Sequence, residues 1–160
     1  MGAIAALVLC GPLFAQASGA TGERAHIAAL YDTFVQAWNK KDAEGVMSIY
    51  VRDKSLFVFD VSPPRQYVGW DAYRDDYKGF FAAVKGPLSE RISELVISAS
   101  GDMAFTHGIA HIRGTLKQGG AFSFAMRFTD VLRKVHGRWF VVHEHLSVPV
   151  DLSTGKAVLH

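Results

Sequence analysis

The stretch from 121 to 149, AFSFAMRFTDVLRKVHGRWFVVHEHLSVP, constrains the fold most, because its pattern predicts two long paired strands. Apolar and polar residues alternate on both sides of a tight turn at 135–138, and this period is typical of half-buried strands. Carboxylates and histidines among large apolar side chains are costly unless they are paired, protonated or functional. The polar residues of this hairpin are therefore the first candidates for a functional site.

The rest of the sequence predicts helices first and strands afterwards. The first helix is expected to begin near Thr21 or Gly22, and Asp42 caps the second. The expected elements are helices at 23–39, 43–51 and 69–84, and strands at 54–61, 89–98 and 103–116. Helices gathered on one face of a mainly antiparallel sheet form an α+β domain. A strongly bent sheet that closes over three helices makes a cone with an internal cavity.

Length and charge limit the possible functions. A chain of 160 residues supports one domain with a substantial core, which we place at 21–160. About half of the residues are apolar and a fifth are charged, which is typical of a globular protein. The formal charge of +2 and the scattered Lys and Arg residues argue against a nucleic-acid partner.

Residues 1–17 predict a secretory signal peptide, which places the mature protein in a bacterial periplasm or outside the cell. The first twenty residues carry no charge, and Ala15-Gln16-Ala17 has the small-x-small pattern of a cleavage site. A lipoprotein modified at Cys10, a retained membrane anchor and a buried helix are the alternatives. Because Cys10 is the only cysteine, cleavage excludes disulfides, thiol catalysis and cysteine-bound metals, and leaves no membrane contact.

Three segments carry a family resemblance: FVQAWNKKDAEGVMSIY, the prolines at 63–64 followed by GWDAY, and GRWFVVHEHLSVP. Together they resemble the nuclear transport factor 2-like superfamily over roughly 23–150. This superfamily includes ketosteroid isomerases, SnoaL-like polyketide cyclases and the association domain of calcium/calmodulin-dependent kinase. The resemblance implies the cone-shaped fold, a small-molecule cavity and a homodimer. It does not imply one activity, because this fold hosts many functions.

The resemblance to ketosteroid isomerases is carried by the segment Asp130-Val131-Leu132-Arg133. In those enzymes the Asp of this segment stays protonated and donates a hydrogen bond to a developing oxyanion. Phe34 stands where their partner Tyr lies, and Asp60 lies two residues beyond the position of their general base. The catalytic candidates are therefore Asp60, Asp130 and Glu144. Ligand-binding contacts and a structural salt bridge, such as Glu144 with Arg113, are the alternative interpretations.

If Asp130 faces the cavity, strand alternation and the resemblance define the remaining lining. The predicted substrate-binding residues are Tyr31, Phe34, Trp38, Tyr50, Trp70, Tyr77, Phe105, His107, His111, Arg113, Met126, Phe128, Val142 and Leu146. The opposite face of the sheet then carries the predicted dimer interface, which consists of Trp139, His143, His145 and Ser147. His107 and His111 would lie about 13 Å apart along one strand, too far to ligate one metal. We expect no metal and no cofactor.

Two functions remain open at this stage. The first is an exported, cofactor-independent isomerase or cyclase that acts on a small apolar carbonyl compound. In it Asp60 takes or relays a proton and Asp130 stabilises the oxyanion, while the inward His107, His111 and Arg113 orient the substrate. The second is a non-catalytic dimeric module that binds a ligand or supports assembly through the same cavity. The sequence has no serine-nucleophile elbow, phosphate loop or dinucleotide fingerprint.

Overall fold

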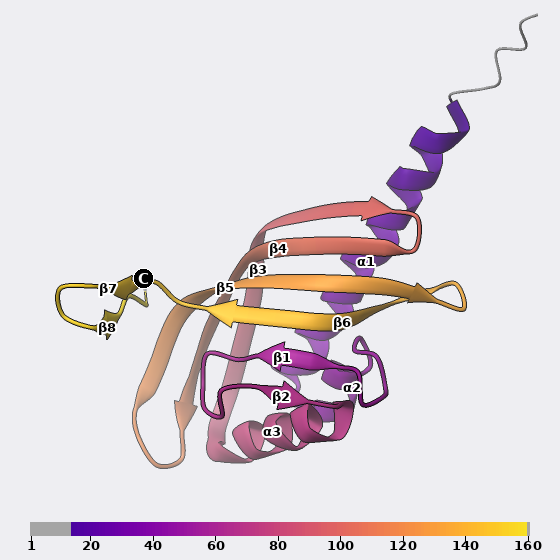
Figure 1. The fold of residues 1–160 in the computed structure, drawn as a ribbon. Coiled ribbons are helices and arrows are strands. Elements are labelled where there is room, and N and C mark those ends of the chain that lie inside the picture. The colour runs from indigo at the N-terminus through magenta and orange to yellow at the C-terminus, as the bar shows by residue number, and fades with distance from the viewer. Residues whose placement is uncertain (1–13, 160) are drawn as a thin grey trace, which may run out of the picture.

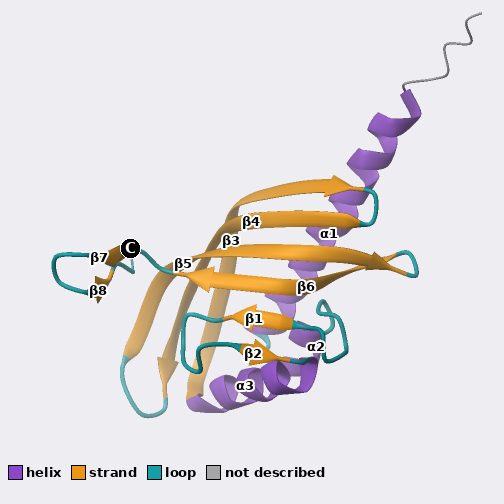
Figure 2. Cartoon of the chain, viewed as in Figure 1, coloured by secondary structure: helices purple, strands orange, loops and turns teal. Residues whose placement is uncertain are grey.

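The computed structural model describes residues 14–159, in which three helices lie against one face of a six-stranded sheet (Figures 1 and 2). The helices are α1 (Phe14–Asn39), α2 (Ala43–Met47) and α3 (Trp70–Ala83). The strands are β1 (Phe57–Phe59), β2 (Tyr67–Val68), β3 (Val84–Ser100), β4 (Met103–Leu116), β5 (Ala121–Val135), β6 (Arg138–Ser147), β7 (Val150–Asp151) and β8 (Lys156–Ala157). This arrangement confirms the predicted α+β class.

The sheet order is β2-β1-β6-β5-β4-β3, and β7 and β8 form a separate two-stranded ribbon. All neighbouring strands run antiparallel except β1, which pairs parallel to β6. The long strands β3, β4 and β5 curve around the helices, as Figure 1 shows. Two register shifts interrupt the pairing of β3 with β4, between Lys85 and Ser89 and between Ser93 and Val96. Since β-bulges bend a strand and increase its twist, these shifts help to shape the cone.

A further bulge, between β5 and β6, decides which side chains face inward. Val131 pairs with His143 and Leu132 with Val141, so Val142 is the extra residue and does not line the cavity. Strand alternation is reset there, and Trp139 therefore lies on the inner side, only 6% exposed. The predictions that Val142 lines the cavity and that Trp139 belongs to the outer face are wrong for this reason.

The predicted orientation of β4 is also wrong. Thr106 pairs with Asp130 across the sheet, so Thr106 shares the inner face with that carboxyl group. The four residues predicted to line the cavity from this strand face outward instead: Phe105, His107, His111 and Arg113. The true inner face carries mostly small side chains at 104, 106, 108, 110 and 112. Small residues are required because a Cβ at Gly108 would come within 2.8 Å of the Phe128 ring.

Helix α1 begins at Phe14, before the predicted start near Thr21 or Gly22. The predicted signal peptide at 1–17 lies for the most part outside the described residues. Among the helices of 14–159, none combines the length and the apolar character needed to cross a membrane.

Candidate functional site

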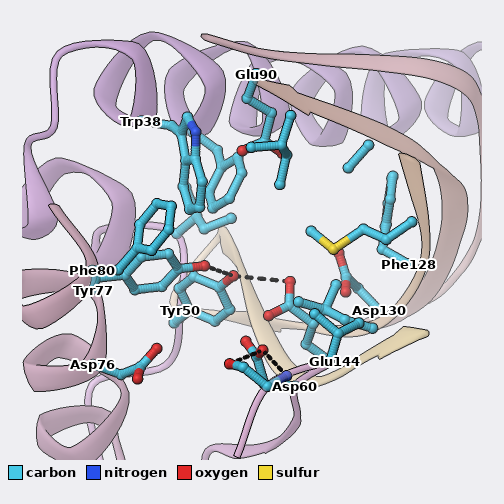
Figure 3. Close-up of a pocket in the computed structure, with 18 of the residues that line it drawn as sticks. Trp38, Tyr50, Asp60, Asp76, Tyr77, Phe80, Glu90, Phe128, Asp130 and Glu144 are labelled. Carbon is cyan, nitrogen blue, oxygen red and sulfur yellow. Dashed lines mark hydrogen bonds between the residues drawn. The ribbon is translucent and has the colours of Figure 1, made fainter. Parts of the chain in front are cut away.

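A cavity of about 510 Å³ lies between the helices and the inner face of the sheet (Figure 3). Exposed residues of the loop after β1 and of α3, such as Ser62 and Gly79, lie at its mouth. Its apolar lining consists of Phe34, Ile49, Phe80, Ile92, Ala110, Ile112, Phe124, Met126, Phe128 and Leu146. An apolar cavity with a few polar groups is the usual form of a small-molecule site.

Asp130 on β5 is the most deeply buried acid of the cavity lining, with 1% of its surface exposed. The Tyr31 hydroxyl donates a hydrogen bond of 2.6 Å to its Oδ2, and the same hydroxyl bonds the Thr106 Oγ1. The other oxygen, Oδ1, has no partner among the described residues. Burial raises the pKa of Asp130 to about 7, against the lowering effect of the Tyr31 hydrogen bond. Near neutral pH this group can therefore donate or accept a proton.

Glu144 on β6 lies directly opposite Asp130 in the sheet. The Tyr50 hydroxyl is 2.9 Å from its Oε1, and the Tyr73 hydroxyl is 2.7 Å from its Oε2. Burial, and next the nearby Asp130 carboxyl, raise the pKa of Glu144 well above its ordinary value. The raised pKa favours the protonated form of Glu144, and its two oxygens accept hydrogen bonds from Tyr50 and Tyr73.

Tyr73 connects the buried Glu144 to Asp60 at the mouth of the cavity. Its hydroxyl lies 3.3 Å from the Asp60 Oδ2 and accepts a hydrogen bond of 3.2 Å from Tyr77. Asp60 is held in place because the Ser62 N–H and hydroxyl donate to its Oδ1 at 2.9 and 2.8 Å. The Tyr73 hydroxyl lies within donating distance of both carboxyl groups and has one hydrogen to give. Glu144, Tyr73 and Asp60 therefore form one hydrogen-bonded chain from the buried end of the site to its mouth.

The other end of the cavity holds Glu90 on β3 and Trp38 on α1 (Figure 3). Glu90 is 4% exposed, and burial alone raises its pKa to about 8. Neither Glu90 Oε2 nor Trp38 Nε1 has a hydrogen-bond partner within the described part of the chain. Both are buried polar atoms, so this end of the cavity is incomplete as it stands.

The lining is acidic. Of the described residues around the cavity, six carry carboxyl groups and none is Lys, Arg or His; the six are Asp60, Asp75, Asp76, Glu90, Asp130 and Glu144. Asp76 is half-buried, and its pKa is raised by burial although Tyr67 donates a bond of 2.5 Å to it. An anionic ligand would meet no compensating positive charge here. Within 14–159, no three His, Cys, Asp or Glu side chains are grouped so that they could hold a metal ion.

The structure brings together most of the predicted site residues. Those that line the cavity are Tyr31, Phe34, Trp38, Tyr50, Asp60, Tyr77, Met126, Phe128, Asp130, Glu144 and Leu146. The others do not: Trp70, Phe105, His107, His111, Arg113 and Val142. Trp70 is buried beside the cavity and donates from Nε1 to the Met47 carbonyl oxygen at 3.0 Å. The catalytic and binding roles of the lining residues remain predictions.

Sequence reasoning missed several polar residues around the cavity, among them Asp75 and Ser62 of its lining. Two others make hydrogen bonds to predicted site residues: Tyr73 to Glu144 and Thr106 to Tyr31. Glu90 and Asp76 belong to the cavity lining. Tyr73 belongs to the aromatic face of α3, which marks a core position and says nothing of its hydroxyl group. The burial of Glu90 could have been predicted. On a strand, Glu90 lies on the same face as Leu88 and Ile92, and a residue on that apolar face is expected to be buried.

The cavity and its fold match a known family. The sequence profile described as SnoaL-like domain matches residues 27–151, which is most of the chain. The chain belongs to the SnoaL-like domain family. Among proteins with curated descriptions, none matches this SnoaL-like chain.

Solved structures agree with the nuclear transport factor 2-like fold. A protein of unknown function from Pseudomonas putida is 28% identical, with 87% of this chain and 95% of that chain covered and a TM-score of 0.77. A superfamily member from Salmonella enterica is 16% identical, over 89% of this chain and 99% of that one, with a TM-score of 0.72. A protein from Novosphingobium aromaticivorans, provisionally named a scytalone dehydratase, is 17% identical. The match covers 81% of this chain and 86% of that chain, with a TM-score of 0.71.

Proposed function

We propose that this SnoaL-like domain is a cofactor-independent acid–base enzyme that moves a proton on a small, uncharged carbonyl compound. The observation that carries the proposal is the free Oδ1 of Asp130, a carboxyl group with a pKa of about 7 in an apolar cavity. Such a group can donate a hydrogen bond to a ligand oxygen on which negative charge develops. The acidic lining favours an uncharged substrate over an anionic one.

In the proposed reaction Asp60 removes a proton from the carbon next to the carbonyl group. The electrons of that C–H bond move toward the carbonyl oxygen, which accepts a hydrogen bond from protonated Asp130. The hydroxyl groups of Thr106 and Tyr31 can donate in sequence, from Thr106 to Tyr31 and from Tyr31 to Asp130 Oδ2, which leaves the proton on Oδ1. Return of the proton to another carbon completes an isomerisation.

The structural neighbour provisionally named a scytalone dehydratase supports acid–base chemistry of this kind on this fold. If the electrons of the enolate instead expel a hydroxyl group from the carbon beyond it, and the proton held by Asp60 passes to that leaving oxygen, water is released and the same first step leads to a dehydration.

Hydrogen exchange tests the proposal without knowledge of the natural substrate. β-Tetralone is a small apolar ketone whose hydrogens next to the carbonyl exchange in D2O, and the exchange is followed by NMR. We expect the protein to accelerate this exchange by at least about a hundredfold over the same buffer. Binding of β-tetralone, measured by calorimetry, with no acceleration would contradict catalysis and identify a ligand-binding module instead.

We also propose that the outer face of the sheet pairs with a second copy of the chain. On this face Phe59, His145, Thr129, His107 and Val96 are successive cross-strand neighbours. Phe105, in the next row, is 49% exposed, so the face presents apolar and imidazole groups across the sheet. Burial of these groups against a copy of themselves would stabilise a dimer.

Sedimentation analysis tests the dimer. We expect the wild type to sediment as a dimer and Phe105→Asp to shift it to monomer, because a carboxylate is costly in an apolar interface. Leu152→Asp is the matched control, since Leu152 is 95% exposed in the separate β7–β8 ribbon and its variant should remain dimeric. A monomeric wild type would contradict the proposal.

A further inference from the structure

The end of the cavity away from Asp130 holds two polar groups that the proposed reaction does not use. We propose that Glu90 and Trp38 form a second polar subsite, which binds an uncharged hydroxyl group of the ligand. The inference rests on the proposed function for the reacting end of the ligand only. It defines the ligand as an apolar body with a carbonyl group at one end and a hydroxyl group at the other.

The subsite is rigid before any ligand binds. The Glu90 N–H donates to the Asn39 Oδ1 at 2.6 Å, and the Asn39 Nδ2 donates to the Glu90 carbonyl oxygen at 3.3 Å. These bonds fix β3 to the end of α1, beside Trp38. The Trp38 ring lies edge-on to the rings of Tyr77 and Phe81, with centroid distances of 5.5 and 5.2 Å. The carboxyl group and the indole N–H are therefore held in place by the surrounding core.

Within the described residues, the buried side-chain polar atoms that lack a partner all belong to the cavity lining: Trp38 Nε1, Glu90 Oε2 and Asp130 Oδ1. The chain has three tryptophans, and two of them are paired: Trp70 donates to the Met47 carbonyl oxygen and Trp139 to the Glu23 carboxylate. Trp38, which lines the cavity, has no partner for its Nε1 within the described residues. A buried polar group without a hydrogen bond costs about 1–3 kcal/mol. A ligand that supplies the partner recovers this cost.

The donors and acceptors present select the ligand group. The indole N–H only donates, so it requires an acceptor, and an ammonium group offers none. A carboxylate would accept, but the described lining contains no Lys, Arg or His to compensate its charge. A hydroxyl group satisfies both sides, because its oxygen accepts from Trp38 while its hydrogen donates to Glu90. An apolar group would leave both protein atoms unpaired.

Binding of matched probes tests the subsite. The dissociation constant of β-tetralone is measured by calorimetry and compared with those of its phenolic derivatives, with the hydroxyl group at each aromatic position in turn. We expect the wild type to bind the best derivative about tenfold more tightly than β-tetralone, since one or two buried hydrogen bonds are gained. Trp38→Phe and Glu90→Leu should each remove most of this preference without weakening the binding of β-tetralone itself.

Three further variants keep the test decisive. Glu90→Gln keeps a donor and an acceptor of similar shape and should retain the preference, as should Trp70→Phe, whose indole lies outside the cavity. Asp130→Ala should no longer accelerate hydrogen exchange of β-tetralone, but it should still bind the best phenolic derivative more tightly than β-tetralone. A failure of the proposed catalysis can then be distinguished from a failure of the subsite. A wild type that binds no derivative better than β-tetralone, or a preference that survives Trp38→Phe and Glu90→Leu, would overturn the inference.

Discussion

The two ends of the cavity both contain buried carboxyl groups, but tyrosine hydroxyl groups hold them at one end only. At one end Glu144 is held by the hydroxyl groups of Tyr50 and Tyr73, and Asp130 by that of Tyr31. At the other end Glu90 is equally buried, and no hydrogen bond to its Oε2 is present in 14–159. Burial raises the pKa of all three carboxyl groups.

Burial alone does not distinguish a carboxyl group that reacts from one that recognises a ligand. Burial favours the neutral form of a carboxyl group at either end, but only hydrogen-bond partners decide where its proton points. At the tyrosine-held end, Tyr73 links Glu144 to Asp60 in one hydrogen-bonded path. The Glu90 end has no such path, so its free donors and acceptors are available to a ligand. Three predictions test this division.

Removal of the Asp130 carboxyl group should have the largest effect. We expect Asp130→Ala to lower kcat/KM for β-tetralone exchange about a thousandfold, because the developing oxyanion loses its donor. The variant should still fold, which circular dichroism and thermal unfolding check. Asp102→Ala, in the exposed turn before β4, is the control and should leave the rate unchanged. An exchange rate for Asp130→Ala within threefold of the wild type would place the chemistry elsewhere.

Loss of the Tyr73 hydroxyl should have the next largest effect. We expect Tyr73→Phe to lower the exchange rate by about tenfold to a hundredfold, because the path between Glu144 and Asp60 is interrupted while both carboxyl groups remain. A change in the pH dependence of the rate should accompany the loss, which a purely structural role would not produce.

Tyr67→Phe is the matched control for this prediction. The Tyr67 hydroxyl donates to Asp76 and takes no part in the path, so its variant should keep the wild-type rate and pH profile. Equal losses in Tyr73→Phe and Tyr67→Phe would show that the tyrosines act only through packing, and the contrast between the two ends of the cavity would lose its basis.

Much of the fold and one end of the site could be predicted from the sequence. Strands β4, β5 and β6 lie where alternation and the turns place them, because each strand has one buried face. Asp130 and Glu144 were predicted to share that face, and they are paired across the sheet. Local sequence determines these features, since two-residue periodicity and turn residues act over short distances.

The errors arose where the geometry depends on distant parts of the chain. The bulge at Val142 resets alternation along β6, and no residue type in its surroundings announces it. On β4 the large residues face outward, and on the inner face Gly108 leaves room for the Phe128 ring. The parity taken from the family resemblance was therefore wrong for this strand. The unpaired state of Glu90 and Trp38 depends on contacts among α1, α3 and β3, which no local pattern contains.

The smallest expected effect concerns the stability that neutral Glu90 contributes. The pKa of Glu90 is about 8 in the folded protein and about 4.3 in an unfolded chain, so between these values only the folded state holds the proton. The free energy of unfolding should therefore fall as pH rises through this range, by up to about 1.4 kcal/mol per pH unit from this group. Asp130 and Glu144, whose pKa values are also raised, contribute in the same direction.

Glu90→Gln isolates the contribution of Glu90 to the pH dependence of the free energy of unfolding, because the amide cannot ionise. Urea unfolding between about pH 5 and pH 8 should show a shallower fall of the free energy for this variant than for the wild type. Glu94→Gln is the control, since Glu94 lies on the same strand but is exposed, and its variant should follow the wild-type slope. Parallel slopes for Glu90→Gln and the wild type would mean that Glu90 finds a partner for its charge. The Glu90 end of the cavity would then resemble the tyrosine-held end.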